Sequence, residues 1–142
     1  MRDKRELLDP AVAHVLDNAL SQTSEEYYSN VFKRYDFREK VRLFFEDYDL
    51  LLSPATPCAA FDVGLNMPPN LTDRNIVSWV YYTYPFNLTG QPAASIPAGF
   101  TKAGLPVGLQ LVSKINSEVD IFRAASAFEA AQPWINSYPK IL

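Results

Sequence analysis

The chain of 142 residues carries a net charge of -3, and apolar residues make up 48% of it against 20% charged. This balance is typical of a globular protein and excludes an intrinsically disordered chain. Lys and Arg are scattered, which argues against a nucleic-acid partner, and no apolar stretch has the length of a membrane span.

The start of the chain and its cysteine content indicate the compartment. The first nine residues alternate charges and lack the apolar core of a signal peptide. The single cysteine, Cys58, has no second cysteine for an internal disulfide and no neighbouring ligands for zinc. The sequence therefore predicts a cytoplasmic protein with no metal site, no cofactor and no membrane partner.

Two helices are predicted in the first third of the chain. Pro10 precedes apolar residues spaced three and four apart, which predicts a short helix with one buried stripe. These residues are Val12, Val15, Leu16 and Leu20. Thr23 and Glu26 have the spacing of a capping box, so a second helix is predicted to begin there. Its apolar stripe shifts near Asp36, where the helix can bend, and continues to Tyr48.

The middle of the chain is rich in proline. The apolar run 50–52 predicts a short buried strand, and the prolines between residues 54 and 69 predict a loop. Residues 75–83 are compatible with either a helix or a strand by propensity. We favour a short helix capped by Thr72 or Asp73.

A hairpin and a last helix are predicted after residue 90. Residues 92–100 and 107–113 have strand patterns, and Lys102-Ala103-Gly104 supplies a turn between them. Ser117, with Asp120 three residues later, predicts the cap of a final helix. Its predicted inward residues are Ile121, Phe122, Ala125 and Phe128.

Several motifs in order resemble the last third of amidase-signature enzymes. These are Asp49-Leu50-Leu51-Leu52-Ser53-Pro54-Ala55-Thr56-Pro57, Asn87-Leu88-Thr89-Gly90-Gln91-Pro92-Ala93-Ala94-Ser95-Ile96-Pro97, Gly104-Leu105-Pro106-Val107-Gly108-Leu109-Gln110-Leu111 and Pro133-Trp134. The match runs from about residue 41 to residue 134. The resemblance implies an α/β fold, here a single domain over residues 1–142 with a short mixed sheet and an antiparallel hairpin covered by helices.

The resemblance also implies a reaction that the chain cannot complete. Family members hydrolyse amide C–N bonds with a serine whose proton passes through a second serine and a lysine, carried on a Gly-Ser-rich segment. The sequence has only five glycines and none lies in a Gly-Gly-Ser-Ser run. We therefore expect no catalytic residue here. The chain resembles the carboxy-terminal fragment of an amidase, supplying sheet and substrate-channel residues to an amino-terminal half and inactive without it.

A second hypothesis belongs to a different class. The chain can instead be a non-catalytic interaction or binding module that keeps a remnant of the fold. Unpaired strand edges and exposed apolar faces drive association between chains, so under either hypothesis the isolated chain is predicted to form a homodimer.

Three positions invite a catalytic interpretation and are rejected. His14 is the only histidine and lies beside the apolar stripe of the first helix, so a partly exposed residue without a catalytic role is expected. Ser113 and Lys114 are adjacent on a strand and therefore point to opposite faces. Cys58 has no basic neighbour to activate its thiol, which favours a small, half-buried residue.

An aromatic cluster lies just before Asn87, where the resemblance implies a substrate channel. It comprises Trp79, Tyr81, Tyr82 and Tyr84. From it we select Trp79, Tyr82 and the adjacent Thr83 as candidate substrate-binding residues, although aromatic residues at this spacing also fill cores. In the glutaminase subunits of this family an aspartate in the segment holds the ammonium of glutamine. Val80 aligns with it here, which implies an apolar or aryl amide substrate.

Overall fold

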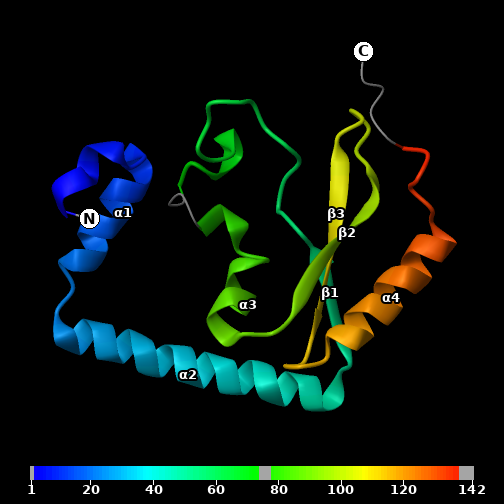
Figure 1. Cartoon of the computed structure of the whole chain (residues 1–142), viewed down its shortest axis with the longest axis horizontal. Helices are drawn as coiled ribbons and strands as arrows, with labels where there is room; N and C mark the ends of the chain where they lie inside the picture. Colours follow the sequence, from blue (N-terminus) through cyan, green and yellow to red (C-terminus); the bar gives the residue numbers. More distant parts are fainter. Residues whose placement is uncertain (1, 74–77, 138–142) are drawn as a thin grey trace.

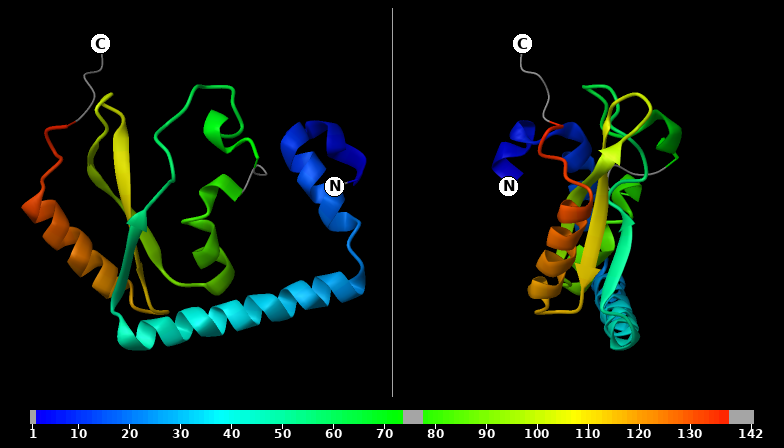
Figure 2. Two further views of the ribbon diagram at one scale, coloured as in Figure 1. Left: turned by 180° about the vertical axis from the view of Figure 1, so that it is seen from behind. Right: turned by 90° about the vertical axis from the view of Figure 1, so that its right-hand side faces the viewer.

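The computed structural model describes residues 2–73 and 78–137. A small sheet lies at one end of the molecule, with helix α4 along one side of it and helix α3 on the other (Figures 1 and 2). Helix α2 runs past the end of the sheet and carries α1 at its far end (Figure 1). The helices are α1 (Pro10–Leu20), α2 (Ser24–Asp47), α3 (Tyr84–Thr89) and α4 (Glu118–Ala131), with 3-10 turns at Arg2–Leu7, Pro69–Leu71 and Ser78–Val80.

The sheet has three strands in the order β1-β3-β2. The strands are β1 (Leu50–Pro54), β2 (Ala93–Phe100) and β3 (Pro106–Ser113). Leu111 of β3 pairs with Leu52 on one side and with Ala94 on the other, and both pairings are antiparallel. The α/β class and the antiparallel hairpin predicted from the sequence are confirmed. Both strand pairs of this sheet are antiparallel, whereas a mixed sheet was predicted.

The central strand β3 holds the best-buried part of the molecule. Leu111 is 2% exposed and Val112 is fully buried, because strands cover both edges of β3 and α4 packs against the sheet. Ile121 of α4 completes this core at 4% exposure. The rigid platform of the chain is therefore β3 with its two neighbours and α4.

Prolines in the sheet lie in the outer strands or at strand ends. Pro97 lies in β2, which is an edge strand of this sheet. Proline, which lacks a backbone N–H, is tolerated in edge strands better than in central ones. The ladder shifts register between Pro97 and Phe100, and Gly99 has a φ of 118°, which favours glycine. This bulge bends the end of the hairpin.

Helix α2 begins with the predicted capping box. The Thr23 hydroxyl oxygen accepts from the Glu26 backbone N–H at 3.2 Å, and the Glu26 carboxylate accepts from the Thr23 backbone N–H at 2.8 Å. The backbone N–H and the hydroxyl of Thr23 hold the pKa of Glu26 below its usual value. A carboxyl with a lowered folded-state pKa stabilises the fold above its unfolded pKa, so this cap weakens as pH falls through the folded pKa. The helix continues as 24 residues without interruption.

Three burial predictions are wrong, and the first is the buried strand at residues 50–52, because Leu52 of β1 is 55% exposed. The stripe predicted to be buried on α1 is largely exposed, with Val12 at 44% and Leu20 at 75%. On α4, Phe122 is 71% exposed although Ile121 beside it is buried. The spacing of the residues on α1 and α4 is that of amphipathic helices, but in the described part of the chain no layer covers these faces.

One helix start differs from the sequence prediction, and one predicted helix cap lacks its hydrogen bond. Part of the helix predicted over residues 75–83 falls outside the described residues, and the described part is the 3-10 turn Ser78–Val80. The helix in this region, α3, spans Tyr84–Thr89 and is capped at its end by Gly90, whose φ of 86° suits glycine. Ser117 does occupy the predicted cap of α4, but its side chain makes no capping hydrogen bond.

The structure also bears on membrane association. Among the helices of residues 2–73 and 78–137, none combines the length and the apolar composition that crossing a bilayer requires. The organisation of residues 1–142 as one domain stays a prediction.

Candidate functional site

The three candidate substrate-binding residues lie in the segment that directly precedes helix α3. Trp79 is half-buried and packs edge-on against Phe61, with ring centroids 5.5 Å apart. Tyr82 and Thr83 are also half-buried, and the rings of Tyr81 and Tyr82 lie 4.7 Å apart. The Thr83 backbone N–H donates to the Val80 carbonyl at 3.1 Å, which closes a tight turn. The segment is thus a folded turn that presents successive side chains in different directions.

A buried glutamine fixes this turn to the sheet. Gln110 of β3 is 3% exposed, and its Nε2 donates to the backbone carbonyl of Tyr82 and to the hydroxyl of Ser53, both at 2.9 Å. Ser53 belongs to β1, so one amide group joins two strands and the turn 79–83. Because both N–H groups of the Gln110 side-chain amide form hydrogen bonds in a buried environment, this link is more rigid than a hydrogen bond at the surface.

Two cavities adjoin this link. The smaller, of about 250 Å³, is lined by Tyr82, Cys58, Pro54, Thr56, Pro57, Ala59, Thr101, Pro106, Val107 and Gly108. The larger, of about 390 Å³, is lined by Thr83, Phe86, Asn87, Gln91, Ala93, Ala94, Ser95 and Gln110. Neither lining contains a charged side chain. Both cavities therefore suit uncharged groups.

The structure separates the predicted site residues. Tyr82 lines the smaller cavity and Thr83 the larger one, so the two adjacent residues face different spaces. Trp79 lines neither of these two cavities and instead contacts Phe61. A role for the three residues in substrate binding stays a prediction.

The structure also places the rejected nucleophile and base candidates. Ser113 is fully buried and its hydroxyl donates to the carbonyl of Ser117 at 2.9 Å. Cys58 is half-buried and lies in the loop after β1, as its interpretation as a small packed residue requires. His14 is exposed on α1, and its Nε2 lies 3.3 Å from the Asn18 side-chain nitrogen. The described residues also contain no cluster of three or more His, Cys, Asp or Glu side chains that could hold a metal ion.

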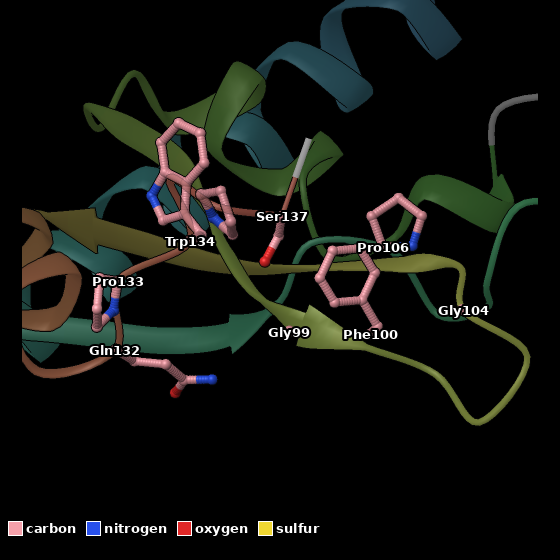
Figure 3. A pocket seen from close by; sticks show the side chains of 9 residues that line it. Gly99, Phe100, Gly104, Pro106, Gln132, Pro133, Trp134 and Ser137 are labelled. Atoms are coloured by element: carbon pink, nitrogen blue, oxygen red, sulfur yellow. The ribbon is translucent and has the colours of Figure 1, made fainter. Parts of the chain in front are cut away.

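A third and larger cavity lies at the turn end of the β2–β3 hairpin. It measures about 530 Å³ and is lined by Pro97, Gly99, Phe100, Gly104, Pro106, Gln132, Pro133, Trp134 and Ser137. Figure 3 shows that Phe100 and Pro106 come from the two strands, whereas Pro133 and Trp134 come from the segment after α4. The resemblance assigns Pro133 and Trp134 only to the closing segment, and the sequence does not predict this cavity.

Two glutamines are the residues that sequence reasoning missed. Gln110 stands between Leu109 and Leu111 in a strand pattern, and a polar residue inside an apolar strand is a signal for a buried hydrogen bond. Gln91 lies between the glycine cap of α3 and Pro92, just before β2 begins at Ala93. It is 7% exposed.

Comparison with known proteins identifies the family. The chain is 36% identical over 110 residues to an acylamidase of Rhodococcus erythropolis, and it is 44% identical over 97 residues to one of the subunits of the glutamyl-tRNA(Gln) amidotransferase of Lacticaseibacillus casei. These matches cover 75% and 67% of this chain but 23% and 19% of the relatives. The chain thus spans about a fifth of the length of these relatives.

Solved structures agree. A 6-aminohexanoate cyclic dimer hydrolase superposes with a TM-score of 0.80 at 26% identity, covering 94% of this chain and 30% of that structure. A bacterial aryl acylamidase of the amidase-signature family gives 0.78 at 27% identity, with 92% and 28% covered. The sequence pattern of the Amidase family matches residues 3–122. The chain therefore belongs to the amidase family.

Proposed function

We propose that this chain forms the part of an amide hydrolase that carries one wall of the substrate channel, and that it does not hydrolyse amides without the rest of the fold. One observation carries the proposal. A folded monomer of 16.0 kDa is expected to expose about 7,400 Å², whereas this chain exposes 11,018 Å². The exposed area therefore exceeds the expected area by roughly 3,600 Å². This excess is larger than the area that one partner buries in an ordinary interface, and it supports a missing structural layer.

Part of this exposed surface is an aromatic face of helix α2. Tyr28, Phe32 and Tyr35 of α2 are each about 60% exposed and stand at helical spacing on one face. Apolar surface of this extent is rare on monomers and marks a contact with other protein. Because the chain covers about 30% of the length of the solved relatives, we propose an amino-terminal amidase half as the partner that covers it.

The hydroxyl groups of the chain support the claim of inactivity. A serine nucleophile needs a base that takes its proton. Here Ser113, Thr89 and Thr83 donate to backbone carbonyls, at 2.9, 3.1 and 3.2 Å. The hydroxyl of Ser53 likewise lies 3.1 Å from the Pro54 carbonyl while it accepts from Gln110. A backbone carbonyl cannot act as a general base, so these groups are bound rather than activated.

The proposed substrate is an uncharged apolar or aryl amide. Neither cavity beside the turn 79–83 is lined by a charged side chain, and Tyr82 supplies an aromatic wall. An ammonium or carboxylate entering such a place would lose its hydration without gaining a partner. Val80 stands where the resemblance places the aspartate that holds an ammonium. Relatives whose names include acylamidase and aryl acylamidase fit this substrate class.

The claim of inactivity is tested by labelling the chain with a fluorophosphonate. This reagent bonds its phosphorus to an activated serine oxygen, with loss of fluoride and of the serine proton. We expect the intact mass of the isolated chain to stay unchanged in mass spectrometry, because the hydroxyls of Ser53 and Ser113 lie against backbone carbonyls and not against a base. A serine hydrolase in the same tube controls for the reagent. A gain of one phosphonyl group on the chain would contradict the proposal.

The second hypothesis, a self-associating module without catalysis, is favoured by the same exposed face of α2. The two hypotheses differ in the expected effect of an amino-terminal amidase half. Under the second hypothesis, adding that half leaves the chain without hydrolytic activity. The cytoplasmic location stays a prediction.

A further inference from the structure

A side chain of helix α2 binds the end of helix α3. The guanidinium Nε of Arg34 donates to the backbone carbonyl of Leu88 at 2.7 Å, although the two residues are 54 positions apart. Figures 1 and 2 show the end of α3 beside α2. Leu88 lies in the last turn of α3, where carbonyl oxygens have no partner within the helix. Arginine side chains stabilise helix ends by bonding such carbonyls, so Arg34 caps α3 from a different helix.

This bond lies on the face of α2 that packs against the rest of the chain. In α2, which is described throughout, three residues are not exposed, and together with Arg34 they recur at the spacings three, seven and four that mark one helix face. These residues are Val31, Val41 and Phe45. The aromatic face of α2 is a neighbouring face of the same helix. Removing the Arg34 bond therefore leaves the aromatic face intact.

The end of α3 also forms part of a cavity wall. Phe86 and Asn87, directly before Leu88, line the cavity of about 390 Å³ beside the turn 79–83. Gln110 lines the same cavity and is fixed to the sheet by its own hydrogen bonds. In contrast, α3 has only 6 residues, and a helix of this length is not stable through its own hydrogen bonds. The position of the α3 wall therefore depends on contacts with other elements.

We infer that Arg34 is a positioning residue, which fixes the α3 wall of this cavity by capping α3 from α2. The inference rests on the proposed function, because it concerns the reaction only where this cavity belongs to the substrate channel. Arg34 acts through α3 and not on a substrate. Its loss is therefore expected to weaken substrate binding and to leave the chemical step largely unchanged.

Arg34→Met tests the inference in the full chain without turnover. The substitution keeps the aliphatic stem and removes the donors. In ¹⁵N NMR we expect the side-chain amide signal of Asn87 to shift or broaden, while that of Gln110 stays in place. The backbone N–H of Gly90, which donates to the Phe86 carbonyl at 2.8 Å, is expected to exchange at least about fivefold faster.

The matched control is Arg38→Met, which makes the same change at an exposed residue one turn later on α2. It should leave the Asn87 signal and the exchange of Gly90 as they are in the unmodified chain. An unchanged Asn87 signal in Arg34→Met would overturn the inference. Equal changes of the Asn87 and Gln110 signals would overturn it too, since Arg34 would then support the whole fold and not the α3 wall.

The kinetics of the pair formed with an amino-terminal amidase half test the link to the reaction. Arg34→Met is expected to raise the KM for 4-nitroacetanilide at least about threefold, with kcat within about twofold of the unmodified pair. A role in folding alone would reduce the amount of active pair and leave KM unchanged, which would contradict the inference. An inactive pair with the unmodified chain would refute the proposed function, whereas the Asn87 signal would still decide whether Arg34 positions α3.

Discussion

In light scattering coupled to size exclusion, the isolated chain at micromolar concentration is expected to show twice the 16.0 kDa mass of one chain. The driving force is burial of the aromatic face of α2, formed by Tyr28, Phe32 and Tyr35 at 59%, 64% and 61% exposure. Without an amino-terminal half, a second copy is the available cover, and a two-fold pairing lets each chain cover the other. The triple substitution Tyr28→Gln/Phe32→Gln/Tyr35→Gln is expected to give a monomer.

The matched control changes the opposite side of the same helix. Asn30→Gln/Lys33→Gln/Lys40→Gln introduces the same helix-compatible residue at three exposed positions and is expected to leave the dimer intact. Circular dichroism must show equal helix content in the two triple variants. A monomeric unmodified chain that binds no hydrophobic dye would contradict the assignment of this face as a contact surface.

The second large effect is expected at Gln110. Gln110→Leu fills a similar volume but removes the two N–H donors that hold the Tyr82 carbonyl and the Ser53 hydroxyl. We expect the free energy of unfolding to fall by about 1–3 kcal/mol, because buried polar groups lose their partner. We also expect faster hydrogen exchange in residues 79–83, while amides of α4 keep their protection.

The control for this substitution is Gln132→Leu, which makes the same change at an exposed position. It should alter neither the unfolding free energy nor exchange in residues 79–83. If Gln110→Leu left exchange in this turn unchanged, the turn would be held by other contacts and Gln110 would have no positioning role.

Local features of the fold could be predicted because their causes are local. Thr23 and Glu26 form the capping box that their spacing predicts, and the glycine-containing turn joins two antiparallel strands. Each of these arrangements is decided by residues within a few positions of one another. The order of the motifs along the chain was sufficient to identify the family.

Burial could not be predicted from the same patterns. Val12 and Phe122 lie on amphipathic stripes of their helices, yet both are exposed. An apolar stripe predicts that a helix face packs against other protein, but not that this protein belongs to the same chain. The helix over residues 84–89 is a different case, since it was not predicted although its signals are local. Pro85 in its first turn and Gly90 at its end are the residues that typically begin and end a helix.

The candidate site could be predicted only in part. The sequence points to the segment 79–83, although it predicts a helix there, and it gives no information on which cavity each side chain faces. That depends on the link from Gln110 to Tyr82 across 28 positions. Trp79 is the example, because its contact with Phe61 joins segments that the local pattern does not relate. Contacts between distant segments decide such details, and local patterns do not encode them.

A complementation assay decides whether this chain supplies only part of the substrate channel, as we propose, or also the catalytic groups. Hydrolysis of 4-nitroacetanilide is measured for the chain alone, for an amino-terminal amidase half alone, and for the two expressed together. The account predicts release of 4-nitroaniline only from the pair. Release by the chain alone at a rate above that of buffer, or none from a pair that forms a stable complex, would contradict it.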